Sequence, residues 1–200
     1  MGTPSGDSFA GPRARNLAKS LLMPALAARF VRADRGPEFR PVVAAQALSW
    51  VGDLALNGSS RGRFLLGLSS FLAAHVAYVS AYRRRSSVGL LDTTGRRRLM
   101  AGGAGASLAM ALAAGRQDRA AAVPVAAYGV TLTTMVAAAA AVDPDRGRNR
   151  ILAGASLFLL SDTLIGVGRF VMAEESPGYQ AAVLGTYGAA QLLICEGLVR

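Results

Sequence analysis

Residues 47–56 read Ala47-Leu48-Ser49-Trp50-Val51-Gly52-Asp53-Leu54-Ala55-Leu56, an apolar run that surrounds one carboxylate. A second run, Leu157-Phe158-Leu159-Leu160-Ser161-Asp162-Thr163-Leu164-Ile165, surrounds another. A charged group at membrane depth is costly, so it usually faces a cavity or a partner. Asp53 and Asp162 are therefore the first candidate functional residues.

The composition favours a membrane protein. Hydrophobic residues make up 52% of the chain and charged residues 17%, and the mean hydropathy is +0.34. The formal net charge of +10 raises the question of nucleic acid. The arginines, however, cluster between apolar runs, as expected beside anionic lipid headgroups, so we expect membrane lipids as partners and no nucleic acid. The only cysteine, Cys195, excludes an intramolecular disulfide and a multi-cysteine metal site.

The apolar runs predict an all-α, polytopic membrane helix bundle. Residues 1–15 are rich in Gly, Pro and Ser and are predicted to be a disordered tail, with residues 16–200 as one transmembrane domain. Each run approaches the length of about 20 residues that a helix needs to cross a bilayer. The seven predicted helices are 17–31, 41–57, 64–82, 98–115, 120–142, 151–172 and 179–198. A secretory signal peptide is an alternative interpretation of the first run.

The distribution of basic residues predicts the orientation. With seven spans, one side carries seven basic residues: Arg13, Arg15, Lys19, Arg61, Arg63, Arg116 and Arg119. The other carries fourteen: Arg29, Arg32, Arg35, Arg40, Arg83, Arg84, Arg85, Arg96, Arg97, Arg98, Arg146, Arg148, Arg150 and Arg200. An excess of basic residues marks the cytoplasmic side, so the N-terminus is expected outside and the C-terminus inside.

The polar residues within the runs are predicted to cluster in depth. A rise of 1.5 Å per residue places both acids roughly 18–20 Å above the cytoplasmic edge, on parallel helices. His75 and Lys19 lie at about 12 and 15 Å by the same rule. Other polar side chains at broadly similar depth are Tyr78, Tyr187 and Gln191. One cavity could therefore contain both carboxylates.

Each candidate also has a structural interpretation. Asp53 could cap its helix or pair with Arg61. A lone histidine such as His75 is more often a packing residue than a metal ligand. The three tyrosines Tyr78, Tyr128 and Tyr187 could simply pack, and the hydroxyls of Ser49 and Ser161 could bond to backbone carbonyls.

Several motifs, taken in order, resemble one known family. One stretch resembles the S-x-x-G-D-x-x-L…F-x-x-G-x-x-x-F-x-x-x-H-x-x-Y signature of the YhhN-like lysoplasmalogenases. Its matching residues are Ser49, Gly52, Asp53 and Leu56, followed by Phe64, Gly67, Phe71, His75 and Tyr78. Three further stretches resemble that family's later helices: residues 124–129 with Met135, residues 157–162, and residues 186–193. Lys19 and Pro24 resemble the family's lysine–proline motif, although Ser20 stands where a proline is usual. A motif at Lys19 and Pro24 would belong to a retained helix, so it argues against a cleaved signal peptide. Members of that family usually have eight helices, so the first one is expected to be missing here.

The resemblance implies a hydrolase in the cell membrane. Its expected reaction cleaves the vinyl ether of a lysoplasmalogen to a fatty aldehyde and a glycerophospho-ethanolamine or -choline, with Asp53 and Asp162 as the catalytic residues and with no cofactor or metal. Asp162 lies nearer the middle of its apolar run, so we expect it to be the acid and Asp53 the base. Residues expected to bind or orient the substrate are Lys19, Ser49, His75, Tyr78, Tyr128, Ser161, Tyr187 and Gln191. Lys19 would neutralise a carboxylate or bind the lipid phosphate.

Two other functions remain open from the sequence. A metal-dependent lipid hydrolase could use Asp53, His75 and Asp162 as ligands. A non-catalytic protein that binds or transports lipids could use the acids to hold a headgroup amine.

Overall fold

The computed structural model describes residues 12–33, 36–58, 60–174 and 176–199, without the side chains of residues 12–20. Every long element in these ranges is a helix, so the all-α prediction is confirmed. The helices are α1 (Pro12–Ala33), α2 (Phe39–Leu56), α3 (Arg61–Arg83), α4 (Thr94–Gln117), α5 (Ala122–Ala141), α6 (Arg148–Phe170) and α7 (Pro177–Leu198). Two short 3-10 helices, η1 (Arg119–Ala121) and η2 (Pro144–Arg146), precede α5 and α6.

The first helix begins earlier than the sequence pattern indicates. The predicted polar tail ends at residue 15, but α1 starts at Pro12. The rest of that tail, residues 1–11, lies outside the described residues.

Local capping sets where several helices begin. The side chains of Ser60, Thr93 and Ser176 accept hydrogen bonds from backbone amides at the starts of α3, α4 and α7. These bonds satisfy amides that have no partner within the helix. Gly147 joins η2 to α6 with a φ of 84°, a conformation that favours glycine. A side chain there would also collide with the carbonyl of Gly197, so glycine lets this turn lie against the end of α7.

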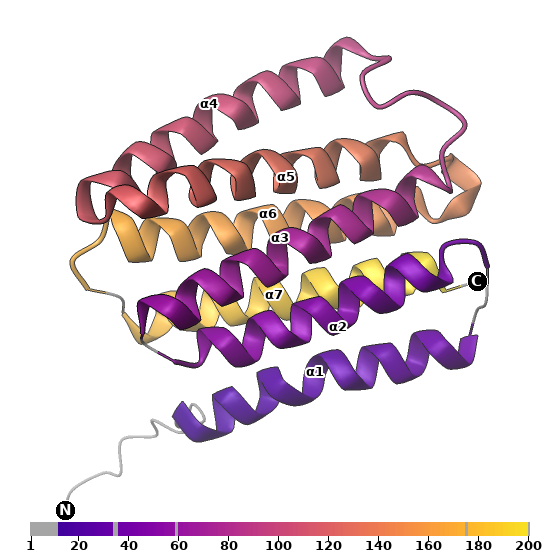
Figure 1. Ribbon diagram of the computed structural model, residues 1–200. Helices are drawn as coiled ribbons and strands as arrows, with labels where there is room; N and C mark the ends of the chain where they lie inside the picture. Colours follow the sequence, from indigo (N-terminus) through magenta and orange to yellow (C-terminus); the bar gives the residue numbers. More distant parts are fainter. Residues whose placement is uncertain (1–11, 34–35, 59, 175, 200) are drawn as a thin grey trace, which may run out of the picture.

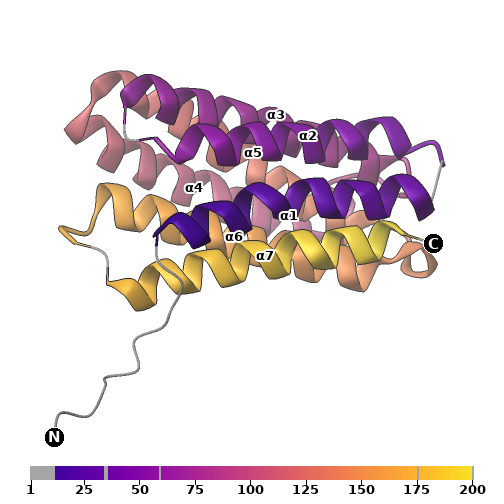
Figure 2. The same ribbon diagram turned by 90° about the horizontal axis from the view of Figure 1, so that it is seen from below.

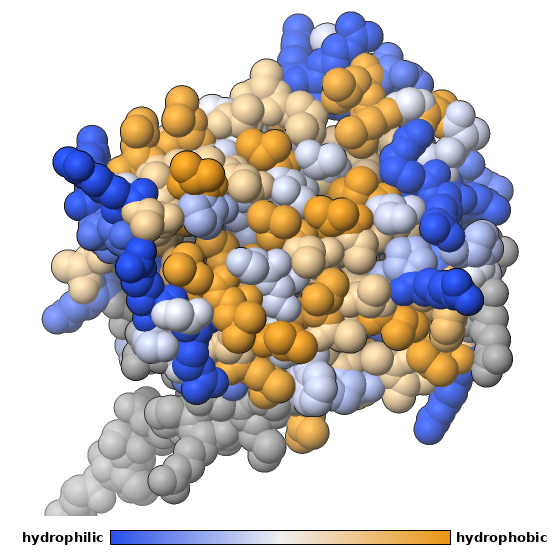
Figure 3. Space-filling model, viewed as in Figure 1, coloured by the Kyte–Doolittle hydropathy of each residue, from blue (hydrophilic) through white to orange (hydrophobic). Residues whose placement is uncertain are grey.

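Four helical segments are long and apolar enough to cross a membrane. They are α3, η1 with α5, α6 and α7. Of the other three helices, α4 carries three successive arginines near its start. Figure 3 shows a hydrophobic band between hydrophilic ends. These features are those of a membrane protein, while the seven spans remain a prediction.

Successive helices run in opposite directions along one bundle (Figures 1 and 2). The helices pack mainly as the pairs α2 with α3, α4 with α5, and α6 with α7, and α1 packs against α2 and α7. Helices α1, α3, α5 and α7 all end at one end of the bundle, which we call the arginine-rich end (Figure 1). The other end is called the opposite end.

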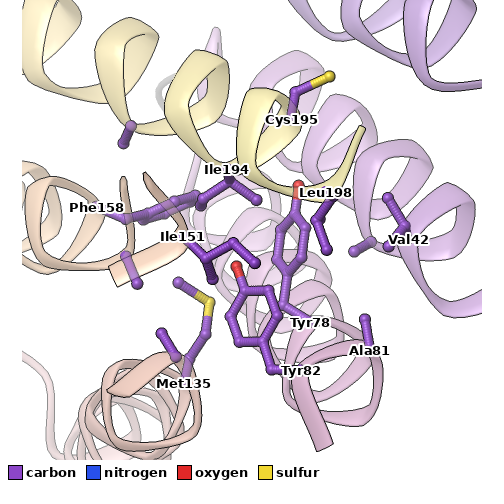
Figure 4. Packing of buried hydrophobic residues seen from close by; sticks show 14 of the residues in the cluster. Val42, Tyr78, Ala81, Tyr82, Met135, Ile151, Phe158, Ile194, Cys195 and Leu198 are labelled. Carbon is purple, nitrogen blue, oxygen red and sulfur yellow. The ribbon is translucent and has the colours of Figure 1, made fainter. Parts of the chain in front are cut away.

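The core is built from side chains of several helices. Figure 4 shows Tyr78 and Tyr82 of α3, Met135 of α5, and Phe158 of α6 within it. Cys195 of α7 is also buried there. The core thus holds together helices that are distant in the sequence.

A buried ion pair ties the loops at the arginine-rich end. Glu38 and Arg85 are 0% and 1% exposed, and the Arg85 Nε donates to Glu38 Oε1 at 2.7 Å. The Arg85 guanidinium also donates to the carbonyls of Gly197 at 3.1 Å and Leu198 at 2.7 Å, at the end of α7. The expectation that Arg85 faces lipid headgroups is therefore wrong, because it lies inside the protein.

The neighbouring loops are joined by exposed hydrogen bonds. The backbone N–H of Ser87 donates to the Asp143 carboxylate at 3.0 Å, and the Ser87 hydroxyl donates to it at 2.7 Å. These bonds favour the ionised form and lower the pKa of Asp143 below its usual range. The α3–α4 and α5–α6 connections are therefore fastened to each other.

The buried ion pair between Glu38 and Arg85 is predicted to stabilise the fold. Glu38→Gln would leave the Arg85 charge buried without its carboxylate, so the free energy of unfolding should fall by about 3–5 kcal/mol. Unfolding in mixed micelles, followed by circular dichroism, measures this loss. The control is Arg29→Gln, which breaks the ion pair of Arg29 with Glu196, whose side chains are 53% and 31% exposed. Arg29→Gln should lower the free energy of unfolding by at most about 1 kcal/mol. Equal losses in both variants would contradict the prediction.

Candidate functional site

One cavity contains both acidic residues singled out in the sequence. Its volume is about 430 Å³ and its wall is formed by α2 to α7. Asp53 and Asp162 line it together with Tyr128 and Tyr187. Most other lining residues are apolar, including Leu56, Phe64, Leu68, Phe71, Leu99, Met110, Val125, Leu132, Leu159, Ile165, Phe170 and Val183. The cavity can therefore hold a long apolar molecule beside two carboxylates.

A tyrosine contacts the carboxylate of Asp162. Tyr128 of α5 donates from its hydroxyl to Asp162 Oδ2 on α6. Asp53 and Tyr128 line the same cavity as Asp162. Both carboxylates and the Tyr128 hydroxyl therefore belong to one cavity wall.

Three residues form a hydrogen-bonded chain that ends at Asp53. The Tyr187 hydroxyl donates to Asp53 Oδ2 at 2.6 Å. Gln191 Nε2 donates to the Tyr187 hydroxyl at 3.5 Å, and the Tyr78 hydroxyl donates to Gln191 Oε1 at 2.9 Å. Each group donates to the next and all are buried, so the chain fixes the position of the Tyr187 hydroxyl against the carboxylate.

The two carboxylates differ in exposure. Asp53 is 1% exposed, whereas Asp162 is only partly buried. Both line the same cavity. Asp162 is therefore the carboxylate that a molecule in the cavity reaches more easily, and Asp53 lies deeper in the wall.

His75 lies behind the cavity wall. Its ring is fully buried and packs against Phe158 and Tyr128, with centroid distances of 4.9 and 5.2 Å. Neither ring nitrogen has a hydrogen-bond partner among the described residues. His75 does not line the cavity, and the described residues contain no group of three potential metal ligands.

Four other predicted binding residues with described side chains do not line the cavity directly: Ser49, Tyr78, Ser161 and Gln191. Tyr78 and Gln191 lie behind Tyr187 in the hydrogen-bonded chain. The Ser161 hydroxyl donates to the Val183 carbonyl at 3.1 Å and so connects α6 to α7, while Ser49 is fully buried. The side chain of Lys19 lies outside the described residues.

Sequence reasoning missed one charged residue of the cavity. Arg98, near the start of α4, lines it together with the two acids. In the sequence, Arg98 is only one of many basic residues on the side predicted to be cytoplasmic. The signal that could have found it is its position at the start of an apolar, glycine-rich run, where an arginine lies next to cavity-lining residues such as Gly102 and Gly103.

Three hydroxyl groups also line the cavity without a signal in the sequence. They belong to Ser107, Thr133 and Thr163. Each donates to a carbonyl one turn earlier in its own helix, at 2.6, 2.9 and 2.7 Å respectively. Their hydroxyl hydrogens are therefore already used, and these residues contribute shape more than hydrogen-bond donors.

Comparisons with known proteins agree with these motifs. The sequence model of the YhhN family matches residues 14–198. Proteins from Mycobacterium bovis and Mycobacterium tuberculosis, each named lysoplasmalogenase, are 30% identical to the chain over 185 residues. The alignment covers 86% of this chain and 65% of each relative, so the chain spans less than two thirds of their length. No solved structure matches.

The family match covers nearly all of the described residues. It includes both acids and every other residue that lines the cavity. The chain therefore belongs to the YhhN family.

Proposed function

We propose that this protein hydrolyses the vinyl ether bond of a lysoplasmalogen. The observation that carries the proposal is the placement of Asp53 and Asp162 in one largely apolar cavity. The names of the two mycobacterial relatives support the same reaction. The products are a fatty aldehyde and a glycerophospho-ethanolamine or -choline.

The first step needs an acid. Asp162 in its protonated form transfers a proton to the outer alkene carbon, while an oxygen lone pair forms the second bond of the oxocarbenium ion. Asp162 takes this role because it is the more accessible of the two acids. The resulting carboxylate remains next to the cation and stabilises it, as paired acids do in glycosidases.

The second acid activates water. Asp53 accepts a proton from water as the oxygen adds to the inner carbon, which gives a hemiacetal. The hemiacetal hydroxyl then returns a proton to Asp162, and Asp53 passes its proton to the ether oxygen as the carbon–oxygen bond breaks. One water is consumed, and both aspartates recover their starting forms.

The chain is proposed to act in the cell membrane. Seven spans with the N-terminus outside would place the arginine-rich end at the cytoplasmic face. The four apolar helical segments support a membrane location. A lysolipid could then enter the cavity from the bilayer without its chain passing through water.

Replacing either acid tests the mechanism. Asp53→Asn and Asp162→Asn should each lower aldehyde release from a lysoplasmalogen by about 10²–10⁴-fold, because an amide cannot exchange the required proton. The measurement is aldehyde formation by the full chain in detergent, with unfolding curves to verify the fold. Asp118→Asn is the matched control, since Asp118 pairs with Arg61 and does not line the cavity. Normal turnover in either acid variant would remove that residue from the mechanism.

The hydrogen-bonded chain behind Asp53 gives a second test. Tyr187→Phe removes the donor to Asp53 and should lower kcat by about tenfold or more, because the carboxylate loses its orientation. Tyr179→Phe is the control, since that hydroxyl donates only to the Leu164 carbonyl at 2.6 Å. Aldehyde release should stay normal in the control. The same loss in both variants would point to a general packing effect instead.

Chelation separates this proposal from a metal-dependent hydrolase. His75 does not line the cavity, so it does not complete a ligand set with Asp53 and Asp162. Aldehyde release should therefore be unchanged after incubation with a chelator and removal of bound metal. Loss of activity that a divalent cation restores would contradict this prediction, and lysolipid binding without turnover would instead favour a lipid carrier.

A further inference from the structure

The three arginines at the start of α4 differ in their hydrogen-bond partners. Arg96 donates to the carbonyls of Leu90 and Gly89, at 2.8 and 3.0 Å. Arg97 donates to the carbonyl of Leu91 at 2.8 Å. Arg96 and Arg97 therefore fasten the loop before α4. Arg98 forms no such bond and no ion pair with the described residues.

Arg98 contributes to the cavity instead. It is exposed, and it is the only basic residue among the described residues that line this cavity. The other charged lining residues are Asp53 and Asp162. The cavity therefore combines an apolar wall, two carboxylates and one guanidinium group that no described residue neutralises.

The packing of α4 against α5 sets the distance from Arg98 to the acids. Ser107 of α4 lies against Gly129 of α5, so closely that a side chain at Gly129 would meet it. Gly129 follows Tyr128, which bonds to Asp162. The level of Ser107 along the bundle therefore differs from that of Asp162 by little more than the reach of the Tyr128 side chain. The Cα of Arg98 is nine residues earlier than that of Ser107, or about 13 Å towards the arginine-rich end.

This backbone offset can be compared with the length of the proposed substrate. Seven bonds separate the outer alkene carbon of a lysoplasmalogen from its phosphorus, about 9 Å in an extended chain. A contact of about 3 Å at each end brings the span between acid and guanidinium to about 15 Å. The offset of about 13 Å, together with the length of the arginine side chain, allows a lysolipid with its alkene at Asp162 to place its phosphate at Arg98.

We propose that Arg98 binds the phosphate of the lysolipid substrate and thereby selects phospholipids over uncharged glycerol ethers. The proposal rests on the proposed function. A guanidinium matches two phosphate oxygens with a fixed pair of donors, which gives both affinity and orientation. The headgroup then lies towards the arginine-rich end. The fatty chain lies towards the opposite end, where α3 starts and α6 ends (Figure 1) and where Phe64 and Phe170 line the cavity.

Binding of molecules that cannot react tests Arg98 apart from catalysis. The two probes are a 1-O-alkyl lysophosphoethanolamine and the 1-O-alkylglycerol of equal chain length, titrated calorimetrically into the full chain in detergent. In Arg98→Ala the ratio of the two affinities should fall about tenfold to hundredfold, because a charge-assisted bond to phosphate is lost. Arg98→Lys should restore part of the ratio, and Arg97→Ala is the matched control that should keep it.

Several outcomes would overturn the proposal. An unchanged affinity ratio in Arg98→Ala would do so, as would an equal loss for both probes. A lost ratio in Lys19→Ala alone would assign the phosphate to Lys19. Inorganic phosphate is compared with additional lysolipid as a competitor at matched ionic strength. If phosphate displaced the bound lysolipid as strongly as additional lysolipid does, the site would be one for free anions.

Turnover distinguishes failure of this proposal from failure of the proposed function. If wild-type protein releases aldehyde, Arg98→Ala should raise KM for the lysoplasmalogen about tenfold to hundredfold with little change in kcat. A fall in kcat with KM unchanged would contradict a binding role. If wild-type protein releases no aldehyde but the affinity ratio still depends on Arg98, the reaction is wrong and the phosphate site stands.

Discussion

The buried ion pair between Glu38 and Arg85 determines how the helices of the site are placed along the bundle. It fixes the start of α2 to the end of α7, because Arg85 also binds the carbonyls of Gly197 and Leu198. Asp53 lies fifteen residues along α2 from Glu38, and Tyr187 lies eleven residues before Leu198 on α7. Since both helices are rigid rods, this contact sets the level at which the Asp53–Tyr187 hydrogen bond forms.

The carboxylates also impose a constraint on the helices around them. A carboxylate removed from water needs hydrogen-bond donors, and this applies to the buried Asp53 and in part to the half-buried Asp162. Tyr187 reaches Asp53 from α7, and Tyr128 reaches Asp162 from α5. These two bonds connect four helices around the cavity. The residues proposed for catalysis therefore also help to hold the bundle in one arrangement.

Sequence reasoning predicted the helices well because each is encoded by a continuous local run. The predicted helix 64–82, for example, lies within α3. It also predicted that Asp53 and Asp162 could face one cavity, because equal depth follows from counting residues along a helix. It did not predict that Arg85 is buried, that Arg98 lines the cavity or that His75 lies behind its wall. Those outcomes depend on the rotation and tilt of each helix, which are set by packing between distant segments.

The contrast between Arg85 and Arg98 shows why charge alone does not assign a role. Both were counted among the basic residues of one face, yet Arg85 is surrounded by one carboxylate and several carbonyls. Its charge is satisfied within the protein and holds helix ends together. Arg98 lies thirteen residues later at the cavity, on the same helix as a stripe of small residues that leaves room for a ligand. The described fold does not use the Arg98 guanidinium, and this is why phosphate binding is proposed for Arg98 and a structural role is assigned to Arg85.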